Sequence, residues 1–204
     1  MQPNDIFTVI NIREYIGNVD ESQLGEDELN SILSEFSCER NPDVEYFLKS
    51  QAIDFTKKNQ SVTYLVFSTE DAQLLGYFTL TIKPITVNAE SFSNTARRKL
   101  SRVSTLDEKE HTYSLAAYLI AQLGKNYTEG ANDRISGAEL LGLAINQIEF
   151  LQYQAGGMVV FLEANDIDKL LSFYQTNKFQ PFDKRVVDRK DREPHELVQL
   201  LRLL

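Results

Sequence analysis

The chain has 204 residues, which suits one domain or at most two and is long enough to bury a hydrophobic core. Its hydrophobic fraction of 42% and charged fraction of 25% are those of an ordinary soluble globular protein. Twenty-one basic against thirty acidic residues leave a net charge of −9. This charge disfavours general binding of nucleic acids and favours encounter with cationic acceptors such as amines.

Cysteine and histidine usage argues against a metal site. Cys38 is the only cysteine, so neither an internal disulfide nor a cysteine zinc cluster can form. The two histidines, His111 and His195, are far apart in the sequence. The N-terminus has no basic region followed by an apolar core, and no apolar run approaches the roughly 20 residues that span a bilayer. We therefore expect a cytoplasmic protein with no membrane association.

In chain order, the first expected element is a strand over the β-rich run Ile6–Ile12. Residues 17–35 are acidic, and they are compatible with a short helix. A longer helix is expected to begin at Asn41, whose side chain would cap it ahead of Pro42. Apolar residues then recur at helical spacing as far as the basic end at Lys57.

Two β-rich runs follow, at 61–67 and 74–82. The short polar linker between them predicts an antiparallel hairpin, and Pro84 is expected to end its second strand. The polar residues 88–110 predict a short helix that carries a group of basic side chains. These are Arg97, Arg98, Lys99 and Arg102. They form either a solvated helix face or a contact to an anionic ligand tail.

The second half of the chain predicts an alternation of strands and helices. In order, the expected elements are a central strand over 113–123, a helix from Ser136 to about Gln152, a strand over Met158–Leu162, a short helix that includes Tyr174, a strand limited by Pro181, and a strand over 196–204. The central helix has one apolar face and ends at consecutive glycines. The unbroken apolar run at Met158 is typical of a strand that is buried on both faces.

The loop that enters the helix at Ser136 is a candidate site for an anionic group, because unpaired amides at a helix start bind phosphates. The amides concerned are those of Arg134, Ile135, Ser136, Gly137 and Ala138. Gly137 would allow close approach, and Arg134 would add a positive charge. The same residues allow a second interpretation, a capping box in which Ser136 and Glu139 satisfy each other's amides without any ligand.

Three short motifs occur in this half. Leu123-Gly124-Lys125-Asn126 ends the central strand, Asn132–Gly137 forms the loop, and Phe173–Phe179 follows the buried strand. In this order they resemble the acyl-coenzyme A core of the GNAT N-acetyltransferases. The family's loop is usually Q/R-x-x-G-x-G/A, so its last glycine is matched, and Ile135 stands where a glycine is usual. Lys178 likewise replaces a usual glycine.

The resemblance implies a single GNAT domain over residues 1–204. The fold would be α/β (α+β in some schemes), with a mixed central sheet that is antiparallel in its N-terminal half and flanked by helices. The central strand and the Met158 strand would run parallel and splay apart. It also implies acetyl-CoA as co-substrate, an amine-bearing acceptor that is a small molecule or a protein or peptide, and no metal. The backbone of Leu123, Gly124 and Lys125 would hold the pantetheine arm, and the amides of 134–138 would hold the pyrophosphate.

By the same resemblance, Tyr174 would be the general acid that protonates the departing thiolate. The alternative is a helix tyrosine whose ring lies in the core. Glu163, at the end of the buried strand, is the best-placed carboxylate to deprotonate the amine. Other candidates for this general base are Glu35, Glu39, His111 and water.

Two alternative functions stay open. Some toxins that acetylate aminoacyl-tRNA share the strand and tyrosine motifs, although they need a basic groove and the net charge of −9 makes nucleic acid an unlikely partner. A local basic patch for such a partner could be formed by Arg97, Arg98, Lys99 and Arg102. A catalytically silent acyl-CoA-binding module is the other alternative, because Ile135 and Glu139 depart from a typical pyrophosphate loop. The sequence allows either a monomer or a homodimer.

Overall fold

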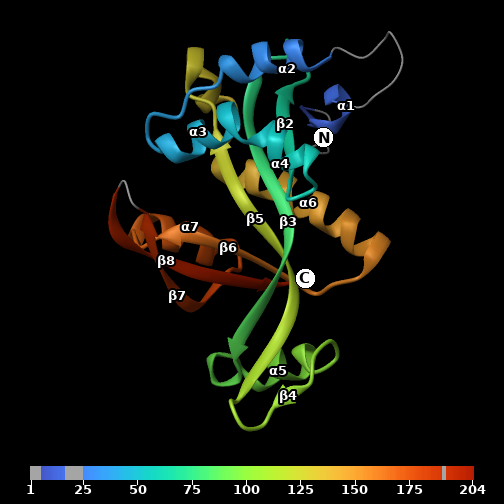
Figure 1. Cartoon of the computed structure of the whole chain (residues 1–204), viewed down its shortest axis with the longest axis vertical. Coiled ribbons are helices and arrows are strands. Elements are labelled where there is room, and N and C mark those ends of the chain that lie inside the picture. Colours follow the sequence, from blue (N-terminus) through green and yellow to red (C-terminus); the bar gives the residue numbers. More distant parts are fainter. Residues whose placement is uncertain (1–5, 17–24, 190–191) are drawn as a thin grey trace. The chain divides into compact units, whose positions relative to one another are not determined.

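The computed structural model describes residues 6–16, 25–189 and 192–204. Eight strands form a mixed sheet that is flanked by helices, and its strand order is β1-β2-β3-β5-β6-β8-β7, with β4 paired to β5 (Figure 1). The chain divides into two compact units, residues 1–81 with 120–147 and residues 82–119 with 148–204. Strands β3 and β5 and helix α6 each contribute residues to both units. The predicted mixed sheet is confirmed.

The first unit begins with an antiparallel arrangement of strands. Its elements are β1 (Phe7–Asn11), α1 (Arg13–Ile16), α2 (Gly25–Ser34), α3 (Pro42–Ser50), α4 (Ala52–Lys57), β2 (Val62–Ser68), the first part of β3 (Leu74–Asn88), the last part of β5 (Thr112–Lys125) and the first part of α6 (Gly137–Ala155). Strands β1, β2 and β3 pair antiparallel, which confirms the predicted first strand and hairpin. Leu33 of α2, Phe36 after this helix and Leu48 of α3 are buried in one core cluster with Leu65 and Tyr77.

The expected helix that begins at Asn41 is two helices, α3 and α4, with a break at Gln51, where φ is −127°. Gln51 is a good helix former, so nothing in the local sequence marks this break. The Asn41 side chain makes no capping hydrogen bond; its carbonyl accepts from the Val44 amide at 3.1 Å instead. Of the acidic stretch 17–35, residues 17–24 lie outside the described residues, and the rest forms helix α2.

The second unit contains the rest of the sheet. Its elements are the second part of β3, a 3-10 turn at Ala89–Ser91, α5 (Asn94–Leu100), β4 (Leu106–Asp107), the first part of β5, the end of α6, β6 (Val159–Asn165), α7 (Asp168–Thr176), β7 (Gln180–Arg189) and β8 (Arg192–Leu203). Strand β5 pairs parallel with β6 at Tyr118↔Val160 and Leu119↔Phe161, as predicted. The core of this unit includes Phe92, Leu100 and Leu115.

Two prolines lie inside strands that they were expected to end or shorten. Strand β3 continues through Pro84 to Asn88, because its pairing with β2 stops at Leu80 and a proline is tolerated where no ladder bond is needed. Strand β7 runs for 10 residues through Pro181 at the edge of the sheet, where the register to β8 shifts between Pro181 and Asp183. The C-terminal strand is confirmed as β8, and it is longer than predicted.

No helix in the described part of the chain is both long and apolar enough to cross a membrane.

Candidate active site

Two glycines in the first unit, Gly76 and Gly124, allow the end of strand β5 to pack very closely against its neighbours. A Cβ atom on Gly124 would lie 2.4 Å from Val44 Cγ1 and 3.0 Å from Tyr77 Cε1, and a Cβ on Gly76 would lie 2.7 Å from the Gly124 carbonyl oxygen. A side chain at either position would therefore force a neighbouring group to move. The backbone of Leu123–Lys125, predicted to hold the pantetheine arm, is thus packed against β3 and the core of the unit.

Asn126 follows directly after strand β5 and is buried, with 3% of its surface exposed. Its hydrogen bonds fix the backbone where the chain leaves the strand. Its backbone amide donates to the Leu75 carbonyl at 2.8 Å, and its side-chain Nδ2 donates to the Leu74 carbonyl at 2.8 Å. Its Oδ1 accepts from the amides of Ser37 at 2.9 Å and Thr128 at 3.1 Å. No role was predicted for Asn126, because two of its three side-chain partners, Ser37 and Leu74, lie far away in the sequence.

The capping box at the start of α6 is present. The Glu139 amide donates to Ser136 Oγ at 3.1 Å, and the Ser136 amide donates to Glu139 Oε2 at 2.7 Å. These hydrogen bonds lower the pKa of Glu139. The Arg134 amide is also used, because it donates to the Ala131 carbonyl at 3.2 Å. Of the five predicted donors, the amides of Ile135, Gly137 and Ala138 have no hydrogen-bond partner within the described residues.

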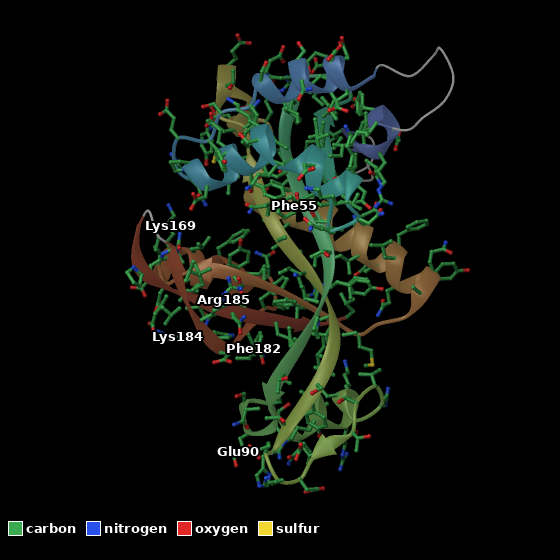
Figure 2. All side chains as sticks on the ribbon, in the orientation of Figure 1. Phe55, Glu90, Lys169, Phe182, Lys184 and Arg185 are labelled. Carbon is green, nitrogen blue, oxygen red and sulfur yellow. The ribbon has the colours of Figure 1, made fainter. Side chains whose placement is uncertain are left out.

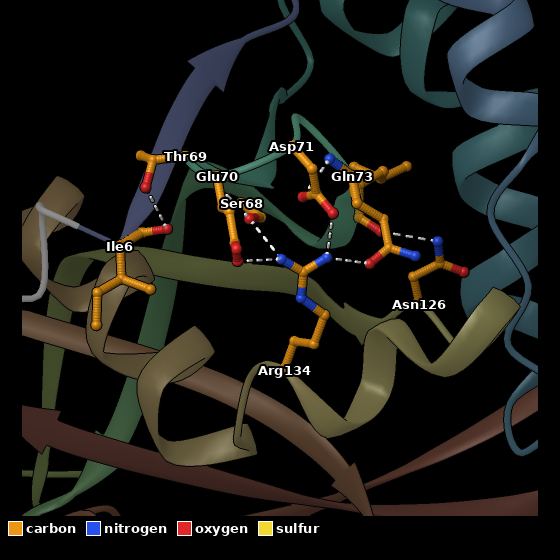
Figure 3. Close-up of polar contacts among 9 residues, drawn as sticks. Ile6, Ser68, Thr69, Glu70, Asp71, Gln73, Asn126 and Arg134 are labelled. Carbon is orange, nitrogen blue, oxygen red and sulfur yellow. Dashed lines mark hydrogen bonds and ion pairs between the residues drawn. The ribbon is translucent and has the colours of Figure 1, made fainter.

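Arg134 is directed at the turn between β2 and β3 (Figure 3). Its Nη1 donates to Asp71 Oδ2 at 2.6 Å and to Gln73 Oε1 at 2.7 Å, and its Nη2 donates to Ser68 Oγ at 2.8 Å. Glu70 adds a longer contact at 3.4 Å. Arg134 therefore ties the loop before α6 to the hairpin turn. The adjacent Ile135 is 1% exposed, so the side chain that replaces the usual glycine is accommodated in the core.

Tyr174 lies on α7 in the second unit and is 9% exposed. Its ring makes edge contacts with Phe173 and Phe179, at centroid distances of 5.0 and 6.0 Å. Burial raises the pKa of Tyr174 to about 12, so the phenol keeps its proton at neutral pH. Its hydroxyl has no hydrogen-bond partner in the part of the chain that the structure describes. A neutral phenol with a free hydroxyl is able to donate a proton to a leaving group.

Glu163, the candidate base, lies on β6 in the same unit as Tyr174. Its Oε1 accepts from Gln199 Nε2 at 2.7 Å and from Nη1 of Arg185, labelled in Figure 2, at 3.2 Å. The alternative bases Glu35, Glu39 and His111 are all exposed. Leu123–Lys125 and residues 134–138 thus lie in the first unit, while Tyr174 and Glu163 lie in the second.

No group of three or more His, Cys, Asp or Glu side chains in residues 6–16, 25–189 and 192–204 is arranged to hold a metal ion.

Comparison with known proteins gives matches in structure alone. No protein-family profile matches the chain, and no curated protein matches it. The solved structure of AtaT complexed with acetyl-methionyl-tRNAfMet is 16% identical, with a TM-score of 0.59 over 94% of this chain and 93% of that chain. A tyrosine-to-phenylalanine mutant of KacT is 16% identical, with a TM-score of 0.60 over 95% and 94%. A tyrosine-to-phenylalanine mutant of the AtaT toxin is 16% identical, with a TM-score of 0.60 over 98% and 90%. The chain has the fold of the GNAT N-acetyltransferases, as the sequence resemblance predicted.

Proposed function

We propose that the protein is an acetyl-CoA-dependent N-acetyltransferase that acetylates the amino group of an aminoacyl-tRNA. The observation that carries this proposal is the structural similarity, over nearly the whole of both chains, to AtaT complexed with acetyl-methionyl-tRNAfMet. A further similar structure is AtaTR bound with acetyl-CoA, which supports the same donor here. These similarities favour the toxin-like alternative over a small-molecule or peptide amine.

The donor would be held in the first unit by main-chain groups. The free amides of Ile135, Gly137 and Ala138 stand at the start of the 19-residue helix α6, where unpaired N–H groups and the helix dipole favour a phosphate. The capping box removes one donor and adds a carboxylate nearby, which reduces the positive potential of this loop. We therefore expect donor binding to rely on the amides rather than on side-chain charge.

In the proposed reaction the neutral amine attacks the thioester carbonyl carbon, the C–S bond breaks, and Tyr174 donates its proton to the departing thiolate. An α-amino group has a pKa near 7.7–8.0, so roughly a tenth of it is already neutral at pH 7. The demand on a general base is correspondingly small. We retain Glu163 as the candidate base; its Oε1 accepts hydrogen bonds from Arg185 and Gln199, which fix the position of the carboxylate.

The test is transfer of radiolabelled acetyl from acetyl-CoA to a mixed pool of aminoacylated tRNA. We expect label in the RNA fraction, and mild base should release this label as N-acetylated amino acid. Deacylated tRNA should take up no label. Label on free amines or peptides alone would restore the small-acceptor interpretation.

A silent binding module would give no transfer to any acceptor, yet acetyl-CoA would still raise the unfolding temperature. Ligand at about 100 times its dissociation constant stabilises a protein by about 2.7 kcal/mol. Absence of both transfer and stabilisation would overturn the transferase proposal.

A further inference from the structure

The second unit contains a cavity of about 240 Å³ between helix α5, the turn that follows α7, and the ends of β7 and β8. Its polar wall is formed by Ser93, Thr95, Lys99, Lys178 and Gln180. Its apolar wall includes Phe92, Leu201 and Leu203. No carboxylate lines this cavity, which is notable in a chain with thirty acidic residues.

The two lysines give the cavity a local positive charge. Lys99 and Lys178 are both exposed, and neither forms an ion pair with any carboxylate in the described residues. By contrast, Lys49, Lys58 and Lys184 are all paired with acidic side chains. Two ammonium groups without internal partners attract a phosphate, and no neighbouring carboxylate has to be displaced.

The backbone at Lys178 adds a second observation. Its φ is 70°, in the left-handed region that favours glycine, and the family motif usually has a glycine at this position. A lysine here adopts an uncommon and strained conformation. The Lys178 residue lines the cavity, where its ammonium group is available to a ligand.

Helix α5 extends the basic surface beyond the cavity. Arg97, Arg98 and Arg102 lie on or directly after this helix, and none of them has an ion-pair partner among the residues that the structure describes. The Arg97 Nε atom is buried and makes no hydrogen bond.

We propose that this cavity binds one nucleotide of a single-stranded RNA end, with the phosphate on the ammonium groups of Lys99 and Lys178 and the base against the apolar wall at Phe92. Polar groups for the phosphate and an apolar surface for the base are what single-stranded nucleic acid requires. This inference rests on the proposed function, for which an acidic protein needs a local cationic site. It assigns that site to the segment around α5.

The test compares binding of a fluorescein-labelled single-stranded RNA hexanucleotide by the wild-type protein and by two sets of variants. The cavity set is Lys178→Gly, Lys99→Ala and their combination. Glycine suits the φ of 70° at position 178, and alanine suits the exposed helix position 99, so both changes are compatible with folding. The control set is Lys83→Ala and Lys169→Ala, which remove the same charges from exposed residues outside the cavity; Lys169 is labelled on α7 in Figure 2.

We expect the combined cavity variant to bind the RNA about tenfold more weakly. Each lost lysine should reduce the slope of log affinity against log salt by about 0.7. The control variant should keep the wild-type slope. Equal weakening by both sets, or wild-type binding by the cavity variant, would overturn the proposal.

Inorganic phosphate and adenosine monophosphate serve as competitors. If either displaces the RNA at concentrations near that of the RNA, the cavity is a small-anion site and the RNA assignment is wrong. The acetyl-transfer assay separates this proposal from the proposed function. Transfer to aminoacyl-tRNA that is unaffected by the cavity variants would refute the cavity alone, whereas lysine-dependent RNA binding without any transfer would refute the function alone.

Discussion

The Arg134 guanidinium donates to the Asp71 carboxylate at 2.6 Å, across 63 residues of sequence, and so joins the loop before α6 to the turn between β2 and β3 (Figure 3). Ser68 and Gln73 accept from the same guanidinium. The free amides proposed to bind the pyrophosphate follow directly after this residue. We therefore expect Arg134 to act on the proposed donor site as a positioning residue, by fixing the loop that presents those amides.

Replacing Arg134 by alanine should release this loop. We expect about tenfold weaker binding of acetyl-CoA, because small misplacements of binding groups are costly. Calorimetric titration measures this change. Arg185→Ala is the control, because it removes an ion-paired arginine from the second unit, which does not contain the proposed donor loop. Equal affinities for the two variants would contradict the role assigned to Arg134.

The pairing of Asp71 predicts a dependence of stability on acid. Hydrogen bonds from Arg134 lower the pKa of Asp71 from 3.8 to about 2. Between these values the unfolded chain binds more protons than the folded chain, so the contribution of Asp71 is complete above about pH 4 and is lost as the pH falls towards 2. Denaturant unfolding of the wild type and of Asp71→Asn should differ above pH 4 and converge near pH 2. A constant difference across this range would refute the prediction.

Tyr174→Phe should keep donor binding and slow acetyl transfer by at least about tenfold, in line with the contribution of a general acid. Because the pKa of Tyr174 is raised to about 12, deprotonation of this phenol should not reduce the rate below pH 10. The fold should be unaffected, since the lost hydroxyl has no partner among the described residues. Tyr153→Phe, at an 86% exposed position, is the control. Full activity of Tyr174→Phe would remove this tyrosine from the mechanism.

Gly124→Ala should destabilise the protein by about 1–3 kcal/mol, the usual cost of overpacking. The added Cβ would lie 2.4 Å from Val44 Cγ1, so the end of β5 or helix α3 would have to move. Gly142→Ala is the matched control, because no atom lies within 4 Å of its added Cβ and alanine stabilises a helix interior by roughly 0.5–1 kcal/mol. Denaturant unfolding compares the two. A Gly124→Ala protein as stable as the wild type would show that this close approach tolerates a side chain.

Local patterns in the sequence were sufficient to predict most helices and strands of this fold. The hairpin of β2 and β3, the capped helix α6 and the parallel strand β6 were all predicted, because alternation, capping residues and apolar runs act over a few neighbouring positions. The capping box at Ser136 was one of two interpretations of its loop, and the structure contains it. No local pattern in the sequence indicates the break between α3 and α4, so it was not predicted.

By itself, the sequence determined the order of strands and helices, the buried faces and the candidate residues of the two halves of the site. Only the tertiary structure decided how those residues are used: that Arg134 serves the β2–β3 turn, that Gly76 and Gly124 pack together, and that Lys99 and Lys178 line one cavity. The physical reason is the separation along the sequence over which each kind of interaction acts. Periodicity and capping depend on residues a few positions apart, whereas these contacts join residues 48 to 79 positions apart, whose meeting depends on the packing of the whole chain.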